Sequence, residues 1–443
     1  MDTHTILRNL GISAFNTMQV AMHKTCQNYK NVILLSPTGS GKTLAYLVPT
    51  LQRINPEKDM VQCTVILPSR ELAIQSEEVL LRMKTGIRSI SLYGGRPTME
   101  EHRKLRDIRP QLVFATPGRL LDHLNKGNIN PFSITTLVID EFDKCLELGF
   151  LEEMQRITSH LKGVDSCLLT SATDMEEIPA FLKIANPKSA RETEKLNFIN
   201  EGDLSDRLKI TKVPSPRKDK LETLGKLLTH LAGAPTIVFV THRESVERIG
   251  NYLQREGFTV SCYHGGMEQD FRERALYKFR SGCTNIMVAT DLAARGLDIP
   301  ETRAIIHYHL PTTKDSFIHR SGRTARWDAE GECFLLLGPE ETLPDFAQAE
   351  DLLDVESLPI RPTQPIWTTL YIGRGKKDKL SKMDIVGFLC KKGGLKANEI
   401  GRIDVNPHFA YAAVSSARMK TLIRNIAGEK IKGMKTLIEE IRK

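Results

Sequence analysis

The segment that most constrains this chain is a glycine-rich loop at Ser36–Thr43 (SPTGSGKT). It has the core of a phosphate-binding loop, G-x-x-x-x-G-K-[ST], with Ser36 in place of the usual first glycine. The apolar run Val32–Ser36 just before it predicts a buried strand, and a helical pattern follows. A turn from a strand into a helix directs backbone N–H groups and the helix N-terminus toward phosphate oxygens. The sequence therefore predicts an α/β domain that holds a nucleoside triphosphate.

The loop residues have distinct predicted roles. Lys42 is expected to neutralise the β- and γ-phosphates and to take part in catalysis, and the Thr43 hydroxyl is expected to ligate Mg²⁺. A chance G-x-G-K-T at a helix start is the alternative, and the strand–turn–helix context disfavours it. The predicted nucleotide-binding residues of this loop are Ser36, Thr38, Gly39, Ser40, Gly41, Lys42 and Thr43.

Acidic residues follow a second apolar run, at Asp140–Asp143 (DEFD). A carboxylate at the end of a parallel strand lies beside a phosphate loop, so Asp140 is expected to hold Mg²⁺, partly through water. Glu141 is placed to act as the general base on the attacking water. Acidic residues are common at helix N-termini, and this would be the better interpretation of Asp140–Asp143 if no phosphate loop preceded them. Phe142 is expected to pack against the domain core.

Short apolar runs alternate with helical patterns through most of the chain. This rhythm is typical of buried parallel strands with crossover helices, and Glu194–Lys218, polar and containing two prolines, separates two such series. We therefore predict two doubly wound α/β domains in tandem. The expected strands are Val32–Ser36, Thr64–Leu67, Leu112–Ala115, Leu137–Ile139 and Cys167–Thr170, then Thr236–Val240, Val260–Tyr263, Ile286–Ala289, Ala304–His307 and Cys333–Leu336.

Charge divides the rest of the chain. Pro339–Ile366 carries one basic and seven acidic residues with five prolines, which predicts an interdomain linker. Trp367–Lys443, called the tail below, carries 17 Lys and Arg against seven Asp and Glu. This surplus is typical of a polyanion binder, although a well-hydrated soluble domain is the alternative.

The tail has a strand and helix order of its own. Strands at Thr368–Gly373, Ile400–Val405, Phe409–Val414 and Lys435–Ile438, with helices at Lys382–Lys392 and Ala417–Ile426, give the order βαββαβ. This is the ferredoxin-like pattern of RNA-recognition domains. Tyr371, Phe409 and Tyr411 are then candidates for base stacking, and ordinary strand residues are an equally good interpretation. The basic residues that offer a second binding face are Arg374, Lys376, Lys377, Lys379, Lys391, Lys392, Lys396 and Arg402.

Targeting and redox features indicate a cytoplasmic protein. No apolar run reaches the roughly twenty residues of a membrane span, and the N-terminus lacks the pattern of a signal peptide. The eight cysteines are scattered singly, without a C-x-x-C pair, so reduced thiols in the cytosol are expected.

The order of short motifs in the first half resembles the first RecA-like domain of the DEAD-box RNA helicases. These motifs are SPTGSGKT, PSRELA (68–73), GG (94–95), TPGR (116–119), DEFD and SAT (171–173). The resemblance implies that Gln19 reads adenine and that Arg70, Gly95, Thr116 and Arg119 meet the RNA backbone. It further implies that Asp143, Ser171, Thr173 and His319 couple the ATP state to domain closure.

Arginines dominate His319–Arg326 (HRSGRTAR) in the second half. Arginine stabilises charge on a transferring phosphoryl group, so Arg323 and Arg326 are the predicted catalytic fingers; a basic surface helix is the alternative. Ala289–Ile299 resembles the coupling motif of the same family, which implies that Gly296 and Asp298 meet the nucleotide and Thr290 the RNA. Other segments that match the family place Arg243, Gln269 and Arg272 against RNA.

In the tail, GRGKKDKLSKMDIVGFL, KANEIGRIDV and GEKIKGMK resemble the RNA-binding domain of the DbpA/YxiN helicases. The resemblance implies a hairpin of 23S ribosomal RNA as the target and a role in large-subunit assembly, with Lys376, Lys377 and Arg402 among the RNA-binding residues. The expected fold is α/β: two tandem RecA-like P-loop domains plus a small α+β RRM-like domain. Its expected parts are 1–195, 205–338, the linker 339–366 and 367–443.

Together these features predict a monomeric, RNA-stimulated ATPase with ATP and Mg²⁺ as cofactors and no membrane partner. Hydrolysis is expected to need both domains, because the phosphates bind one and the arginines come from the other. A DNA translocase is disfavoured by DEFD, Gln19 and the tail. A non-catalytic RNA scaffold is disfavoured because Lys42 and Glu141 are present. A general RNA chaperone or mRNA-remodelling helicase remains the main alternative.

Overall fold

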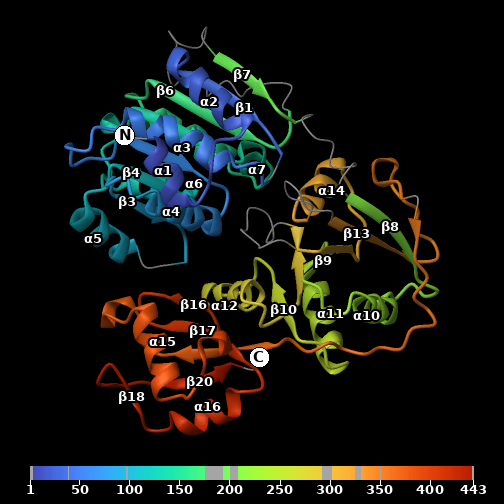
Figure 1. Cartoon of the computed structure of the whole chain (residues 1–443). Coiled ribbons are helices and arrows are strands. Elements are labelled where there is room, and N and C mark those ends of the chain that lie inside the picture. Colours follow the sequence, from blue (N-terminus) through green and yellow to red (C-terminus); the bar gives the residue numbers. More distant parts are fainter. Residues whose placement is uncertain are drawn as a thin grey trace. The chain divides into compact units, whose positions relative to one another are not determined.

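The computed structural model describes residues 3–37, 39–95, 98–174, 193–199, 208–291, 302–324, 331–349 and 351–441. They form two compact units, one that holds β1 to β7 and one that holds β8 to β20 (Figure 1). Among these residues, no helix is both long and apolar enough to span a bilayer.

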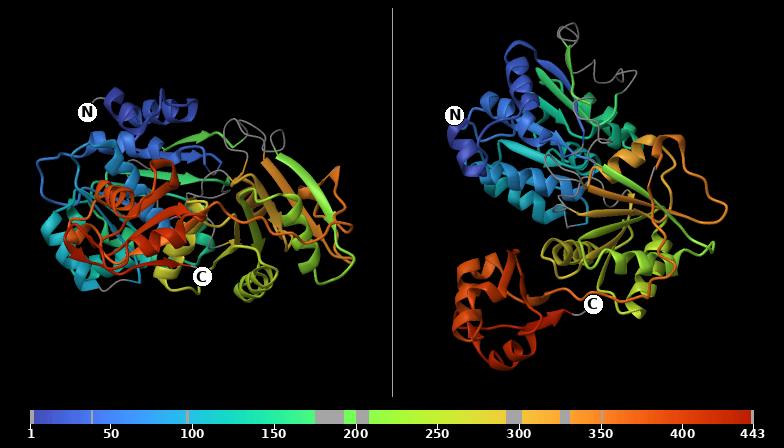
Figure 2. Two further views of the ribbon diagram at one scale, coloured as in Figure 1. Left: turned by 60° about the horizontal axis from the view of Figure 1, so that its bottom comes forward. Right: turned by 45° about the vertical axis from the view of Figure 1, so that its right-hand side comes forward.

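The first unit is a parallel sheet in the order β3-β4-β2-β5-β6-β1-β7, with helices on both faces (Figure 2). Alternate strand residues such as Leu34 and Ile33 point to opposite faces, so each face has its own core. The strands are β1 (Asn31–Leu35), β2 (Cys63–Ile66), β3 (Ser89–Leu92), β4 (Leu112–Ala115), β5 (Thr136–Ile139), β6 (Ser166–Ser171) and β7 (Thr193–Asn197).

Helices α1 to α4 pack on one face of this sheet and α5 to α8 on the other. The helices are α1 (Thr3–Leu10), α2 (Thr17–Asn28), α3 (Lys42–Arg53), α4 (Arg70–Met83), α5 (Thr98–Ile108), α6 (Pro117–Asn125), η1 (Pro131–Ser133), α7 (Phe142–Glu147) and α8 (Leu151–His160). Phe142 is 3% exposed and belongs to the core under α5 to α8, as predicted.

The second unit begins with another parallel sheet, in the order β10-β11-β9-β12-β13-β8-β14. Its elements are β8 (Leu208–Pro214), α10 (Leu221–His230), β9 (Thr236–Val240), α11 (Arg243–Arg255), β10 (Val260–Tyr263), α12 (Gln269–Arg280), β11 (Ile286–Thr290), β12 (Ala304–His307), α14 (Lys314–Ser321), β13 (Gly331–Leu337), η3 (Asp345–Ala347) and β14 (Asp351–Leu352). The predicted tandem of doubly wound sheets is confirmed.

The tail belongs to the same unit and has an antiparallel sheet in the order β16-β17-β15-β20. Its elements are β15 (Trp367–Ile372), η4 (Lys376–Asp378), α15 (Lys382–Lys391), η5 (Ala397–Glu399), β16 (Ile400–Val405), β17 (Ala410–Ser415), α16 (Met419–Asn425), β18 (Lys430–Ile431), β19 (Met434–Lys435) and β20 (Ile438–Ile441). The predicted α+β class is confirmed, although the last strand lies three residues later and a small β18–β19 hairpin precedes it.

Some strands lack the apolar runs by which the sequence predicts the others. The polar segment Glu194–Lys218 contributes β7, which pairs with β1, and β8, which pairs with β13. β7 alternates exposed and half-buried residues at the sheet edge, and β3 (SISL) at the other edge contains two serines. Edge strands need less apolar surface than central ones, so they lack the continuous apolar run by which the central strands are recognised.

The segment Pro339–Ile366, called the strap below, packs along the second unit. Lys220 Nζ meets Glu341 Oε2 at 2.6 Å, and Lys226 Nζ meets Glu356 Oε2 at 3.1 Å. Val355 is fully buried, and β14 within the strap pairs with β8. The predicted linker is thus held on the second unit, because its acidic residues pair with lysines more than a hundred residues earlier.

Candidate nucleotide site and RNA-facing loops

The phosphate loop joins β1 to α3, as the sequence predicts. Its first residue is fixed because Ser36 N–H donates to the Ser171 carbonyl at the end of β6 (2.9 Å). Gly41 caps α3 in the left-handed region (φ 89°), and a Cβ atom there would lie 2.5 Å from Gln19 Nε2. Only glycine fits this position without strain, which explains the second glycine of the pattern.

Lys42 places a positive charge inside this loop. Its side chain is buried, and Nζ donates to the carbonyl oxygens of Ser36 (2.8 Å) and Pro37 (2.9 Å). These contacts hold the ammonium beside the backbone that, by its sequence pattern, receives phosphates. The arrangement fits the predicted charge-neutralising role of Lys42.

Gln19 and Asn16 hold the phosphate loop from α2. Gln19 Oε1 accepts from Asn16 N–H (3.1 Å) in a capping box, and Gln19 Nε2 donates to the Gly41 carbonyl (3.2 Å). Asn16 Nδ2 donates to the Ser40 carbonyl (3.0 Å). The Gln19 amide thus supports the loop, and one N–H and one lone pair remain by count for adenine, the role that the sequence predicts. None of the motifs marks Asn16, although an asparagine three residues before a glutamine is a signature of a capping box.

Asp140 lies at the end of β5 and is 2% exposed. Its Oδ1 accepts from Thr170 Oγ1 on β6 and from Glu141 N–H (3.0 Å). Burial raises the pKa of Asp140, while the Thr170 hydrogen bond, the Lys42 charge and the Tyr46 hydroxyl oppose the rise. Thr170 and Tyr46 are further site residues that the motifs do not mark, because their partner is distant in sequence.

Glu141 has a strained backbone. It is the N-cap of α7 with φ 50° and ψ 52°, the left-handed region that non-glycine residues rarely adopt. Its N–H donates to Thr170 Oγ1 (3.3 Å) as well as to Asp140, and these bonds stabilise the turn. Strain of about 1–3 kcal/mol is typical of functional sites, and it fits the predicted general base.

The predicted coupling residues of this unit lie together. Thr173 Oγ1 donates to Asp143 Oδ2 (3.2 Å). Ser171 Oγ donates to the Thr173 carbonyl (2.6 Å) and accepts from Thr173 N–H (3.1 Å). The DEFD and SAT segments are therefore joined directly by a hydrogen bond. The Ser171 carbonyl of the SAT segment also accepts from Ser36 N–H of the phosphate loop.

The oxygen ligands at this site fit magnesium. Mg²⁺ needs only one or two protein oxygens and keeps water and phosphate for its other positions. The Thr43 hydroxyl at the start of α3 and the buried Asp140 carboxylate supply such a pair, and Tyr46 hydrogen-bonds to both side chains. Among the described residues, no three or more His, Cys, Asp or Glu side chains gather as an all-protein metal site.

Two of the predicted RNA residues in the first unit lie in contact. Arg70 begins α4, and its guanidinium lies against Gly95, where a Cβ atom would collide with Arg70 Nη1. Gly95 has φ 91°, so both space and backbone require glycine. Thr116 is the N-cap of α6, and its N–H donates to the Leu92 carbonyl (3.1 Å) at the end of β3.

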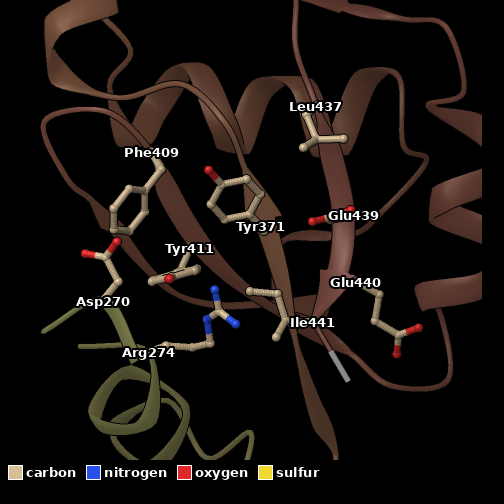
Figure 3. Close-up of a pocket in the computed structure, with 9 residues that line it drawn as sticks. All are labelled: Asp270, Arg274, Tyr371, Phe409, Tyr411, Leu437, Glu439, Glu440 and Ile441. Carbon is tan, nitrogen blue, oxygen red and sulfur yellow. The ribbon is translucent and has the colours of Figure 1, made fainter. Parts of the chain in front are cut away.

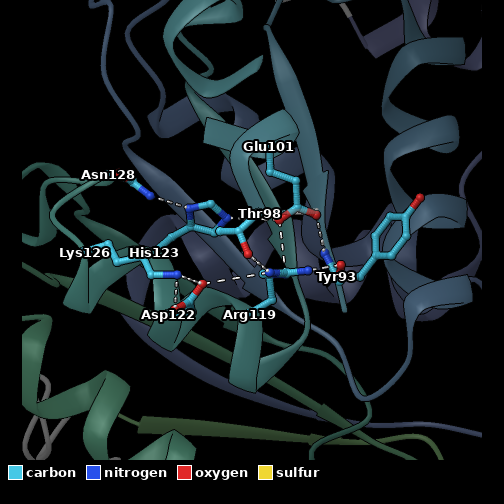
Figure 4. A network of polar contacts seen from close by, with 8 residues as sticks. All are labelled: Tyr93, Thr98, Glu101, Arg119, Asp122, His123, Lys126 and Asn128. Atoms are coloured by element: carbon cyan, nitrogen blue, oxygen red, sulfur yellow. Dashed lines mark hydrogen bonds and ion pairs between the residues drawn. The ribbon is translucent and has the colours of Figure 1, made fainter. Parts of the chain in front are cut away.

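Arg119 lies in an internal network (Figure 4). Its Nε meets Glu101 Oε2 at 3.1 Å, its Nη1 donates to Thr98 Oγ1 (2.6 Å), and its side chain is 11% exposed. Glu101 also accepts from Tyr93 N–H (3.3 Å) and contacts His123 Nε2 (3.1 Å). In this structure Arg119 donates to Glu101 and Thr98 and so ties α6 to α5, while its predicted contact with RNA stays a prediction.

The two arginines of HRSGRTAR that the structure describes, Arg320 and Arg323, are buried, so they do not form a basic surface helix. Arg320 lies in the last turn of α14 and is 3% exposed. It pairs with Asp291 (Nη2 to Oδ2, 2.7 Å) and donates to the His309 carbonyl (2.7 Å). It is a scaffold residue that the sequence analysis did not single out. Arg323 is also 3% exposed, just after α14, and His319 is buried within that helix.

The other RNA-facing predictions of this unit fall at element ends. Thr290 is the last residue of β11, Arg243 opens α11 and pairs with Glu244 (2.8 Å), and Gln269 opens α12. Arg272 follows one turn later and donates to Tyr263 Oη (3.2 Å). Strand and helix termini at the carboxyl edge of a parallel sheet are the usual place for ligand contacts.

In the tail, Lys376 and Lys377 are exposed on η4, and Arg402 is exposed on β16 beside Asp404 (3.0 Å). Thr38, Gly296, Asp298 and Arg326 lie outside the described residues, so their predicted roles stay predictions.

Comparisons with known proteins cover almost the whole chain. Residues 16–180 match DEAD/DEAH box helicase, residues 219–328 match the helicase conserved C-terminal domain, and residues 369–440 match the DbpA RNA binding domain. The chain is 31% identical over 442 residues to ATP-dependent RNA helicase DbpA of Escherichia coli (strain K12), covering 97% of this chain and 95% of that protein. The DbpA of Bacillus subtilis (strain 168) is 26% identical over 476 residues, covering 100% and 98%.

Among solved structures, Saccharomyces cerevisiae Dbp5 bound to RNA and ADP BeF3 is similar with a TM-score of 0.67. The identity is 25%, and the match covers 81% of this chain and 93% of that one. With the tandem parallel sheets, the phosphate loop and the bonded DEFD and SAT segments, these findings show that the chain belongs to the DEAD-box ATP-dependent RNA helicases of the DbpA type.

Proposed function

We propose that this helicase is directed by its tail to a hairpin of 23S ribosomal RNA and acts in assembly of the large ribosomal subunit. The observation that carries the proposal is the continuous similarity to DbpA helicases, tail included, over 97% of the chain. The hairpin is the target that the tail sequence implies. The basic surplus of the tail supplies the sequence-independent part of the affinity.

The two parts divide the work. The core residues that face RNA, such as Arg70, contact the sugar-phosphate backbone, which carries no sequence information directly. The tail therefore provides the address, and tethering raises the local concentration of neighbouring duplexes at the core.

Hydrolysis uses the buried site of the first unit. Mg²⁺, held by Thr43 and Asp140 and by the phosphates, supplies charge neutralisation when bound. Glu141, fixed at its strained turn by Thr170, orients the water that attacks. Arg323 and Arg326 are the proposed fingers for the charge that develops on the phosphoryl group.

We further propose a monomer in the cytoplasm. The single scattered cysteines favour a reducing compartment. Light scattering of the purified full chain measures the oligomeric state directly.

The ATPase rate tests the address. We expect a 23S rRNA fragment that carries the hairpin to stimulate hydrolysis at least about tenfold more at limiting RNA than unrelated RNA of equal length. Removing residues 367–443 should abolish that preference and leave hydrolysis with excess unrelated RNA.

Equal stimulation by both RNAs would contradict the ribosomal address and favour a general RNA chaperone, the alternative. A shortened chain that kept full selectivity would place the address in the core. Neither result would alter membership of the helicase family.

A further inference from the structure

The outer face of the tail sheet is covered. Strand residues alternate, so Leu370 and Ala412 point into the tail core, whereas Thr369, Tyr411 and Ala413 point to the other face. The tail helices leave that face open, because the core cluster that they share with the sheet contains only the inward residues. Yet Thr369, Tyr411 and Ala413 are 1%, 2% and 0% exposed. Another surface of the second unit must bury them.

That surface is α12 and the turn after it. The rings of Tyr277 and Tyr411 lie 5.0 Å apart at 32°, and Tyr277 Oη donates to the Arg402 carbonyl (2.7 Å). A Cβ atom on Gly282 would lie 3.5 Å from Trp367 Cδ1. Burial raises the pKa of Tyr411, whose hydroxyl is hydrogen-bonded to Arg274. Ring contact, hydrogen bonds and burial thus make a packed interface.

A pocket of about 510 Å³ lies beside this interface (Figure 3). Tyr371 and Phe409, the other two aromatic residues of the sheet face, line it together with Tyr411. Among the residues that the structure describes, which end at Ile441, the charged ones that line it are the carboxylates Asp270, Glu439 and Glu440 and the cation Arg274. An excess of carboxylates repels the phosphates of RNA, so the charge of the pocket disfavours an RNA-stacking platform.

We propose that the aromatic face of the tail is a docking surface for α12 and does not read RNA. Tyr411 is the centre of this dock, and Tyr371 and Phe409 border it. RNA then binds the tail on basic residues outside this face, among them Lys376 and Lys377 on η4. The tail and the parallel sheet of the second unit consequently move as one body.

The position of the dock gives it a consequence for the helicase. α12 begins with Gln269 and Arg272, which are predicted to face RNA, and its later turns carry Arg274 and Tyr277 to the tail. A docked tail therefore fixes where its bound hairpin lies relative to the RNA-facing residues of the second unit. This last step rests on the proposed ribosomal address, whereas the dock itself does not.

Amide hydrogen exchange on the full chain tests the dock from both sides. Tyr411→Ala should speed exchange in the second half of α12 by at least about threefold, and Tyr277→Ala should do the same in β17, because each loses its cover. Phe409→Ala is the control, and α15 on the far side of the tail should not change in any variant. Unchanged exchange in both α12 and β17 would overturn the proposal. Tyr277 and Tyr411 lie outside the hydrophobic core clusters of the second unit, so both alanine variants should keep their fold.

Hairpin binding supplies the second arm, with the 23S rRNA fragment as the probe. Tyr371→Ala and Phe409→Ala should leave the Kd within about twofold, and the double change Lys376→Ala with Lys377→Ala should raise it about tenfold. A tenfold rise for Tyr371→Ala or Phe409→Ala would show that the face reads RNA and would overturn the proposal. If the unchanged chain does not prefer the hairpin, the ribosomal address fails, and hydrogen exchange still decides the dock.

Discussion

At the scale of single residues, His309 ties a protonation state to a backbone position. Its Nδ1 accepts from Thr241 N–H (3.1 Å), at the start of the segment that leads to the RNA-facing Arg243. Burial lowers the pKa of His309 from 6.5 to about 4, and the Lys220 ammonium adds to the effect. Glu341 opposes the decrease, whereas His242 and Arg320 contribute to it. The neutral imidazole is therefore the form that the fold requires.

We predict that the second unit loses stability as the pH falls from 6.5 toward 4. In this pH window His309 binds a proton in the unfolded chain but stays neutral in the folded protein. The free energy of unfolding therefore decreases, by at most about 1.4 kcal/mol per pH unit for one proton. His309→Asn keeps an acceptor near Nδ1 without titrating, so its urea midpoint should change less between pH 7 and pH 5. An identical pH slope in the two proteins would contradict this assignment.

The phosphate loop also depends on single side chains outside it. Its shape depends on hydrogen bonds from Asn16 and Gln19, which lie more than twenty residues earlier. The sequence motif marks the loop, and side chains outside the motif fix its backbone.

At the scale of elements, Glu101 connects three of them. Its carboxylate, on α5, contacts Arg119 and His123 of α6 and accepts from Tyr93 N–H after β3. Asn128 Nδ2 donates to His123 Nδ1 (3.0 Å), which leaves Nε2 as the donor to Glu101. The GG and TPGR segments are therefore held by one buried carboxylate that belongs to neither of them.

Glu101→Gln should lower the free energy of unfolding of the first unit by about 3 kcal/mol, because it leaves the buried Arg119 guanidinium without its nearest charge partner. It should also raise the RNA concentration for half-maximal ATPase activity more than it lowers the maximal rate. Asp122→Asn is the matched control, since this partner is 33% exposed and 3.9 Å from Arg119, and it should cost less than about 1 kcal/mol. Urea unfolding and ATPase titrations measure both; equal losses in the two variants would refute the role of Glu101.

At the scale of the whole chain, the strap is part of the second unit. Beyond its ion pairs, Gln364 Nε2 donates to the Gly257 carbonyl (2.8 Å), and Arg361 N–H donates to Thr229 Oγ1 (2.9 Å). The path from the parallel sheet to the tail is therefore laid down on the protein surface, which supports the fixed position of the tail.

Val355→Ala should destabilise the second unit by about 2 kcal/mol, because it removes two methyl groups from a fully buried side chain in the sheet core. Leu352→Ala, three residues away and 63% exposed, should change stability by less than about 0.5 kcal/mol. Urea unfolding of the two full-length variants makes the comparison. Equal midpoints would mean that the strap contributes no packing.

Local pattern in the sequence determined the classes of structure and chemistry. The apolar runs and the phosphate loop predict the two parallel sheets and the nucleotide site, and the order of elements predicts the class of the tail. These signals are local, because strand periodicity, helix starts and glycine turns are set by neighbouring residues.

Only the tertiary structure decided which groups each polar or aromatic side chain meets. Arg119 pairs with Glu101, the acids of the strap pair with lysines of the second unit, and Tyr411 packs against Tyr277 with tilted rings. No local pattern encodes any of these pairings. Charge and aromatic character mark a side chain as able to bind, and they leave its partner open. The fold chooses the partner, because burial makes an unsatisfied charge or hydrogen bond costly and so brings distant groups together.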